Sequence, residues 1–92
     1  MPKSEVPSNP FKDAYTSRAI NNALKGVKSF PQDGTSFLNK EGLLPSKTLG
    51  YYKEFTVVSK GVTHRGVQRI VTGLNGEVYY TPDHYKSFIR IR

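Results

Sequence analysis

Four side chains in the second half of the chain could together cleave a phosphodiester bond: Glu54, Arg65, Arg69 and His84. The 2′-hydroxyl of RNA can attack the neighbouring phosphorus if a base removes its proton and an acid protonates the departing 5′-oxygen. A carboxylate and an imidazolium supply these two functions. Guanidinium groups match the geometry of phosphate oxygens and stabilise the charge that develops on them. These residue types therefore predict metal-independent cleavage of RNA, provided that the fold brings them together.

The carboxylate lies in a segment that favours an extended strand. Residues 51–58 are rich in aromatic and β-branched side chains. Because successive side chains of a strand point to opposite faces, Phe55 and Val57 share one face and Glu54 lies on the other. The apolar pair is the natural core face, so we expect Glu54 on a partly solvated face of a sheet.

Arg65 and Arg69 share one parity in the next segment, whereas Ile70 has the opposite one, so a hairpin can bring both arginines near Glu54. A single glutamate–arginine pair is most simply a cross-strand salt bridge of little energetic value. Two arginines around one carboxylate leave guanidinium donors for a phosphate. His84 follows a Thr-Pro-Asp turn, from which an imidazole could extend over the sheet, although most loop histidines are ordinary surface residues.

Hydrophobic patterns predict the elements that would position these residues. Residues 11–25 have a helical period, with Asn9-Pro10 as a start signal and Gly26 as a stop signal. Residues 36–41 have the character of an exposed loop. Strands are expected at residues 51–58, 67–72, 77–80 and 86–91, with a turn at 59–61. One helix followed by hairpin-linked strands predicts an α+β fold, in which an N-terminal helix packs on a three- to five-stranded antiparallel sheet.

Size and charge narrow the class of protein. Ninety-two residues build a single domain, which we expect to span residues 1–92 with a loose arm at 1–8. The formal net charge is +7, which favours polyanionic partners such as nucleic acid. The absence of cysteine excludes disulfides and cysteine-based zinc sites, and two histidines do not suggest a metal cluster. We expect no metal, no cofactor, no membrane contact and a monomer.

Four segments in the same order resemble the bacterial guanyl-specific ribonucleases of the streptomycete and barnase types. They are PQDGTSFLNKEGLLP (31–45), GYYKEFTVV (50–58), THRGVQRIVTG (63–73) and VYYTPDHYKSFIRIR (78–92). The resemblance implies that Glu54 is the general base and His84 the general acid, and that Arg65 and Arg69 bind phosphate. It also implies that Tyr85 lines the phosphate site.

The resemblance also implies a guanine-recognition loop at residues 37–41, with Gln32 at the edge of the site. Backbone N–H groups of Phe37, Leu38, Asn39 and Lys40 would contact guanine O6 and N7, and the Glu41 carboxylate would accept hydrogen bonds from N1 and N2. Phe37 would supply a stacking surface, although an aromatic residue after a turn could equally belong to the core. Leu38 and Lys40 replace a polar residue and an arginine of the streptomycete members, so we expect a softer guanine preference.

Three interpretations of function remain open from the sequence. The first is a guanyl-specific endoribonuclease that acts on single-stranded RNA, secreted in a mature form without a signal peptide. The second is the same activity as a toxin domain, delivered into a target cell and paired with an acidic barstar-like inhibitor or immunity protein. The third is a catalytically silent RNA-binding module, but a carboxylate in the phosphate site would only weaken binding there. A plain interaction domain would leave all four residues unexplained.

Overall fold

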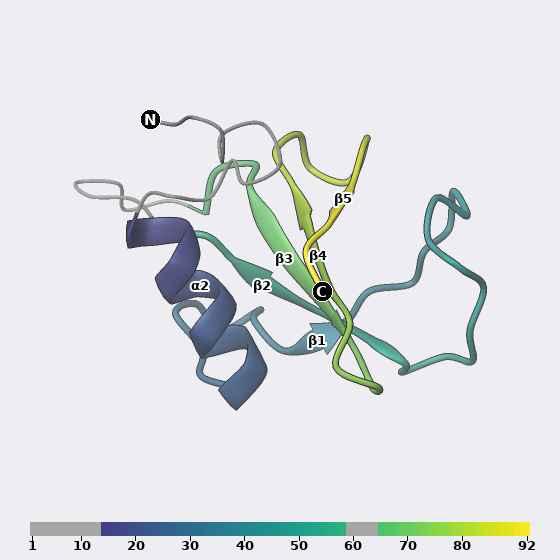
Figure 1. Ribbon diagram of the computed structural model, residues 1–92, viewed down its shortest axis with the longest axis horizontal. Helices are drawn as coiled ribbons and strands as arrows, with labels where there is room; N and C mark the ends of the chain where they lie inside the picture. The colour runs from purple at the N-terminus through teal and green to yellow at the C-terminus, as the bar shows by residue number, and fades with distance from the viewer. Residues whose placement is uncertain (1–13, 59–64) are drawn as a thin grey trace.

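The computed structural model describes residues 14–58 and 65–92, which form one helix and one antiparallel sheet (Figure 1). The five strands pair in chain order, each with the next, so the sheet is a simple meander. This architecture confirms the predicted α+β fold. The elements are α2 (Ala14–Lys25), β1 (Thr35–Ser36), β2 (Tyr52–Thr56), β3 (Arg69–Gly73), β4 (Val78–Thr81) and β5 (Ile89–Arg90).

Helix α2 covers one face of the sheet and builds the first core there (Figure 1). Ala19 and Ala23 lie one turn apart on the helix, and their small side chains let it approach β2 and β3 closely. On the strands, Phe55 is paired with Ile70, so both side chains point toward the helix. This first core contains Ala19, Ala23, Phe55, Val57, Ile70, Val78 and Tyr80.

The opposite face of the sheet carries a second core, rich in aromatic rings and covered by loops. Val71 is paired with both Glu54 and Tyr79, so these three residues share this face. The core contains Leu44, Tyr51, Tyr52, Val71 and Tyr79, against which the half-buried rings of Phe37, Tyr85 and Phe88 pack. Glu54 therefore projects from the face opposite to α2, as its strand parity predicts.

The boundaries of all five strands differ from the sequence expectation. Strand β2 spans 52–56 rather than 51–58, and β4 spans 78–81 rather than 77–80. Strand β1 was not predicted. Residues 36–41 were expected to form an exposed loop, but Ser36 pairs with Lys53, and the preceding Thr35 pairs with Glu54. Strand β3 begins at Arg69 rather than at residue 67. The last strand contains two residues rather than the span 86–91. Some predictions fall on residues that the structure does not describe. These are the expected arm at 1–8, the helix start at Asn9-Pro10 with residues 11–13, the turn at 59–61, and His64.

Over the part of the chain that the structure describes, no helix combines the length and the apolar character needed to cross a membrane.

Candidate active site

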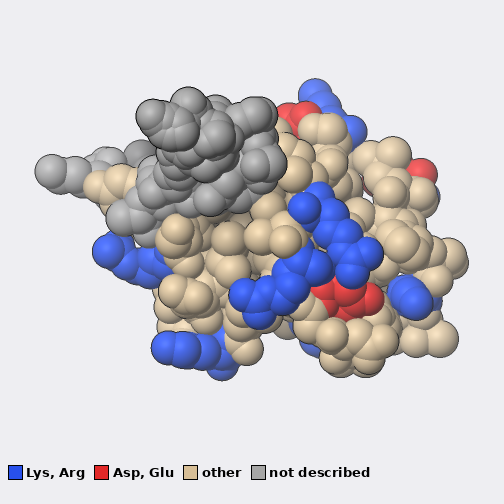
Figure 2. Space-filling model, viewed as in Figure 1, with Lys and Arg blue, Asp and Glu red and all other residues tan. Residues whose placement is uncertain are grey.

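A groove of about 770 Å³ runs between two loops on the face of the sheet opposite to α2. One wall consists of residues 36–41 with Leu43, and the other consists of residues 84–86. Glu54 reaches the groove from β2. Figure 2 shows basic side chains gathered over the strands of one face, where they surround a small acidic patch. The groove thus brings the predicted guanine loop, the predicted base and the predicted acid into one site.

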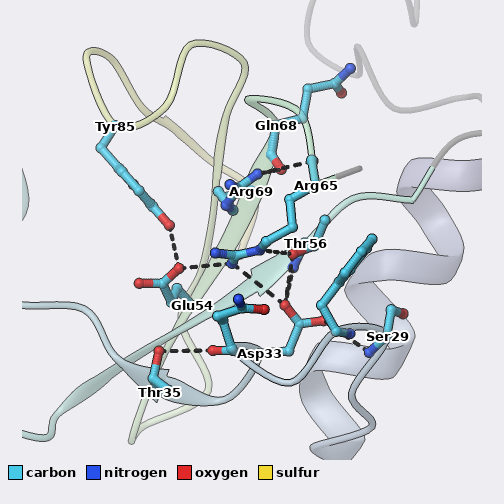
Figure 3. A network of polar contacts seen from close by, with 11 residues as sticks. Ser29, Asp33, Thr35, Glu54, Thr56, Arg65, Gln68, Arg69 and Tyr85 are labelled. Carbon is cyan, nitrogen blue, oxygen red and sulfur yellow. Dashed lines mark hydrogen bonds and ion pairs between the residues drawn. The ribbon is translucent and has the colours of Figure 1, made fainter. Parts of the chain in front are cut away.

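The carboxylate of Glu54 is held at one oxygen by two donors (Figure 3). Arg65 Nη2 donates to Glu54 Oε1 at 3.1 Å, and the hydroxyl of Tyr85 donates to the same oxygen at 2.6 Å. The side chain of Glu54 remains 19% exposed. Neither contact engages Oε2, so the second oxygen can accept a proton from a bound substrate while the first is fixed.

Arg65 is held in place from its far side by a buried carboxylate and a hydroxyl (Figure 3). Its Nε donates to Thr56 Oγ1 at 2.9 Å, and its Nη2 lies 3.6 Å from Asp33 Oδ1. The Thr56 hydroxyl donates in turn to Asp33 Oδ1 at 2.7 Å. This chain of contacts limits the positions that the guanidinium can adopt, which is the preorganisation that a phosphate-binding group requires.

Asp33 organises the turn that precedes β1. The side chain is only 1% exposed, yet both carboxylate oxygens accept hydrogen bonds. Oδ2 accepts the backbone N–H groups of Ser29 and Phe30, and Oδ1 accepts the backbone N–H of Thr56. A buried carboxylate is tolerated only with such partners, so Asp33 ties this turn to the end of β2 and to Arg65.

Arg69 is almost fully buried beside this network, with 3% of its surface exposed. It is paired with Thr56 across the strands and therefore lies on the same face as Glu54. Its Nη1 donates to the carbonyl oxygens of Arg65 and Gln68. The hairpin thus brings Arg65 into contact with Glu54, whereas Arg69 supports the backbone that carries Arg65.

The loop that carries His84 is shaped by Asp83. The Asp83 carboxylate accepts the backbone N–H groups of Lys86 and Ser87 and the hydroxyls of Ser87 and Thr81. These bonds, led by the one from the Ser87 hydroxyl, lower the pKa of Asp83 from its ordinary value of 3.8.

The two residues after Asp83 have positive φ angles. His84 has a φ of 57° and Tyr85 a φ of 76°, values that few residues other than glycine adopt. The loop bonds and the bond from His84 N–H to the Val67 carbonyl hold this conformation. The imidazole of His84 is therefore presented, exposed, at the groove wall.

Tyr85 closes the inner end of the groove against Phe37. The two rings are stacked with centroids 4.8 Å apart and an interplanar angle of 28°. Burial raises the pKa of the Tyr85 hydroxyl well above its usual range, and the hydrogen bond to Glu54 raises it further. Tyr85 therefore acts as a neutral hydrogen-bond donor. Phe37 is half-buried, so it contributes to the second core and also presents a surface to the groove.

The predicted guanine loop is stabilised by Asn39. This residue has a φ of 55°. Its side-chain Nδ2 donates to the carbonyl oxygen of Leu44, and its Oδ1 accepts a hydrogen bond from the backbone N–H of Leu44. The N–H of Gly42 also bonds to the Asn39 carbonyl. These contacts curl the loop, and they leave the side chains of Leu38, Lys40 and Glu41 exposed beside the groove.

Most of the residues singled out in the sequence lie at this site, with two exceptions. Arg69 does not line the groove, and its guanidinium bonds to the carbonyl oxygens of Arg65 and Gln68. Gln32 is exposed and does not line the groove. It lies in the turn before β1, where its backbone carbonyl accepts hydrogen bonds from Thr35. Sequence reasoning missed Asp33, Thr56 and Lys86. The Pro-Gln-Asp-Gly turn was visible, but nothing local indicates that its aspartate contacts an arginine far along the chain. Within residues 14–58 and 65–92, no cluster of His, Asp or Glu could hold a metal ion.

Comparison with known proteins gives matches in sequence and in structure. The family model described as ribonuclease matches residues 2–92. Guanyl-specific ribonuclease Sa3 of Kitasatospora aureofaciens is 52% identical over 67 residues, which are 72% of this chain and 48% of Sa3. Guanyl-specific ribonuclease St of Saccharopolyspora erythraea is 49% identical over 63 residues, which are 68% of this chain and 62% of that protein. The chain thus spans only about half the length of Sa3.

Solved structures of ribonuclease Sa2 have the same fold. Sa2 in complex with mononucleotides superimposes with a TM-score of 0.80 at 41% identity, and the match covers 87% of this chain and 84% of Sa2. Sa2 with guanosine-2′-cyclophosphate also gives a TM-score of 0.80, at 39% identity with 90% of each chain covered. Sequence and fold are therefore similar to the same group of proteins.

Proposed function

The chain belongs to the ribonuclease family, and from this premise we propose that it is a guanyl-specific endoribonuclease acting on single-stranded RNA. The observation that carries the proposal is the groove that joins Glu54 and His84 to the loop at residues 37–41. A carboxylate base, an imidazole acid and a candidate base-binding loop in one groove form a complete set for this reaction. The guanosine cyclophosphate bound to Sa2 supports the same substrate class.

In the first step, Glu54 Oε2 removes the proton of the 2′-hydroxyl, whose oxygen then attacks the adjacent phosphorus. His84 donates a proton to the departing 5′-oxygen, so the bond between phosphorus and that oxygen breaks without release of an alkoxide. Arg65 stabilises the charge on the non-bridging oxygens, while the Tyr85 hydroxyl holds the Glu54 carboxylate. The product is a guanosine 2′,3′-cyclic phosphate. In a slower second step His84 activates water, Glu54 returns its proton to the 2′-oxygen, and a 3′-phosphate remains.

Guanine selectivity would come from the loop at residues 37–41. Backbone N–H groups donate to O6 and N7, and the exposed Glu41 carboxylate accepts from N1 and N2. Adenine carries an amino group in place of O6 and has no N–H at N1, so the polar groups of the site would be left unpaired. Recognition through backbone N–H groups does not require particular side chains at positions 38 and 40. Leu38 and Lys40 therefore soften the guanine preference without removing it.

The decisive experiment is cleavage of the dinucleotides GpC, ApC and UpC in the presence of EDTA, with products followed by chromatography. We expect fast cleavage of GpC to a cyclic guanosine phosphate, slow cleavage of the others and no effect of the chelator. Binding of single-stranded RNA without cleavage of any dinucleotide would contradict the proposal and favour a silent RNA-binding module. Inhibition by EDTA would contradict the metal-independent mechanism.

A basic ribonuclease is also suited to an acidic protein inhibitor of the barstar type, and we propose that the chain is a monomer with such a partner. The net charge of +7 supports this proposal, because complementary charge accelerates association. The enzyme would act outside the producing cell, either secreted or delivered as a toxin into a target cell. A co-purification of the chain with candidate acidic proteins encoded beside it would test this proposal.

A further inference from the structure

The turn that joins β3 to β4 carries a reactive pair of residues, Asn75 followed by Gly76, which the proposed function does not use (Figure 1). The sequence contains this dipeptide once. The backbone nitrogen of the residue after an asparagine can attack the side-chain carbonyl carbon and close a five-membered ring. A Cβ on that following residue hinders the attack, and glycine has none. Neither residue lines the groove.

The hairpin itself requires a glycine directly after Asn75. The N–H of Gly73 donates to the Glu77 carbonyl at 2.9 Å, and the N–H of Gly76 donates to the Gly73 carbonyl at 3.0 Å. These two bonds close a three-residue loop, whose last residue adopts the left-handed conformation. Gly76 has a φ of 92°, in the region that favours glycine. The reactive pair is therefore part of the design of this turn.

The Asn75 side chain is accessible to this reaction. It is exposed, and its amide forms no hydrogen bond with another residue that the structure describes. The backbone N–H of Asn75 donates to Glu77 Oε1 at 3.1 Å. Apart from its chain neighbours, no described residue has an atom within 4 Å of the place where a Cβ of Gly76 would stand, so water can approach the reacting atoms. An exposed turn of this kind opens locally without unfolding of the sheet.

The other described asparagines lack this combination of features. Asn39 is followed by a lysine, and its side-chain amide is bonded through both Nδ2 and Oδ1 to Leu44. Asn21 and Asn22 lie within α2, where helical hydrogen bonds hold the backbone N–H groups that follow them. Reactivity should therefore be concentrated at Asn75.

We propose that Asn75 is a site of spontaneous deamidation through a succinimide, so that the charge and the stability of the protein change with its age. Hydroxide removes the proton of the Gly76 nitrogen, which then forms a bond with Asn75 Cγ. The side-chain nitrogen leaves as ammonia after it takes a proton from water, and this step regenerates the hydroxide.

Water then opens the ring in one of two ways. Cleavage between the Gly76 nitrogen and Asn75 Cγ gives aspartate, whereas cleavage between that nitrogen and the backbone carbonyl carbon gives isoaspartate. In both cases one water is consumed and one ammonia is released. Either product lowers the net charge of +7 by one.

Both products disturb the contacts of Glu77 in the turn. Glu77 accepts the Asn75 N–H through Oε1 and the Tyr51 hydroxyl through Oε2, the latter at 2.6 Å. Aspartate at position 75 places a second negative charge beside this carboxylate. Isoaspartate also adds a carbon to the backbone inside the three-residue loop, which strains the two bonds of Gly73 that close it. Deamidation should therefore lower the stability of the hairpin.

The experiment ages the folded protein at mildly alkaline pH and follows its tryptic peptides by liquid chromatography and mass spectrometry. Peptide 70–86 contains Asn75, peptide 29–40 contains Asn39, and peptide 19–25 contains Asn21 and Asn22. We expect complete loss of the Asn75 amide, with aspartate and isoaspartate as products, while the other two peptides remain intact. An unaged sample digested in parallel corrects for conversion during digestion.

The matched variant is Asn75→Gln, which keeps an amide but would have to close a six-membered ring. Aged wild-type protein should gain an acidic form in ion-exchange chromatography and unfold at a lower urea concentration, whereas aged Asn75→Gln should do neither. Asn75→Asp should elute with that acidic form without ageing.

Three results would overturn the inference. The first is an intact Asn75 in the folded protein under conditions that deamidate a synthetic peptide of residues 70–86. The second is conversion of peptide 29–40 or 19–25 before peptide 70–86. The third is an aged wild-type protein whose unfolding in urea matches that of the fresh protein.

Discussion

At the scale of single residues, the two oxygens of Glu54 have different surroundings. Oε1 accepts hydrogen bonds from both Arg65 and Tyr85, and these bonds fix the plane of the carboxylate. Oε2 takes part in neither bond. Such an asymmetry suits a general base, because one oxygen orients the group and the other receives the proton.

Glu54→Gln tests this role of the carboxylate. An amide keeps the shape of the side chain and an oxygen for the Tyr85 hydroxyl, but it cannot take up the 2′-proton. We expect kcat on GpC to fall about 10²- to 10⁴-fold, while the Kd of the unreactive 2′-deoxy analogue stays within a few-fold of wild type. An unchanged kcat would exclude Glu54 as the base.

Glu41→Gln addresses base selection rather than chemistry. The amide loses the charge-assisted acceptor for guanine N1 and N2, so the ratio of kcat/KM for GpC to that for ApC should fall by about ten-fold or more. The matched control is Glu77→Gln, because Glu77 bonds to Tyr51 outside the groove and should leave the ratio unchanged. A ratio that Glu41→Gln leaves at the wild-type value would rule out this carboxylate as the guanine acceptor.

At this scale, the sequence predicted the features that depend on residues close together in the chain. The side of β2 from which Glu54 projects follows from strand alternation alone, and the contact with Arg65 follows from a hairpin. The bond from Tyr85 to Glu54 and the contact of Asp33 with Arg65 join residues 31 or more positions apart, and no local pattern encodes them. The resemblance to a family identified Tyr85 but not Asp33.

At the scale of elements, the turn before β1 and the end of β2 are linked by Thr56 and Asp33. Thr56→Val removes the hydroxyl that bridges Asp33 and Arg65 while the volume of the side chain is kept. We expect the free energy of unfolding, measured by urea denaturation, to fall by about 1–3 kcal/mol, because a buried carboxylate loses a donor.

The control for this prediction is Thr35→Val. The Thr35 hydroxyl bonds to the Gln32 carbonyl at an exposed position, so its loss should change stability by no more than about 0.5 kcal/mol. Equal effects of the two substitutions would show that the bridge to Asp33 adds nothing specific.

The loop at residues 81–87 has a predictable pH dependence. Folding lowers the pKa of Asp83, so ionised Asp83 stabilises the loop at every pH above its ordinary value of 3.8. This contribution is lost as the pH falls through the lower folded value. Amide hydrogen exchange of Lys86 and Ser87 should therefore accelerate in acid relative to that of the sheet. Asp83→Asn should show the faster exchange already at neutral pH; protection equal to wild type would exclude this anchor.

The same loop explains why the last strand is shorter than its sequence suggested. Residues 86–91 have strand-like composition, but Asp83 captures the N–H groups of Lys86 and Ser87, so pairing with β4 begins only at Ile89. Strand β1 escaped prediction for the opposite reason. Two polar residues carry no alternation pattern, and only the partner strand β2 makes them extended.

At the scale of the whole molecule, the net charge of +7 raises the rate at which the protein encounters RNA. We expect the association rate of a fluorescent single-stranded oligonucleotide, measured by stopped flow, to fall steeply with salt, whereas dissociation changes less. The equilibrium constant should have a log–log salt slope of about −0.7 for each phosphate bound. A slope near zero would exclude binding through the phosphate backbone.

The aromatic core on the face opposite to α2 serves both stability and substrate binding. Phe37 and Tyr85 pack against that core and also line the groove. A single substitution of either ring therefore changes both the stability of the fold and the activity. The side chains of exposed neighbours such as Leu38 and Lys40 are not part of the core, so substitutions there need not lower stability. Over evolutionary time, the inner end of the groove can drift only slowly, whereas its rim is free to diversify. New substrate preferences in this lineage would therefore arise first at the rim.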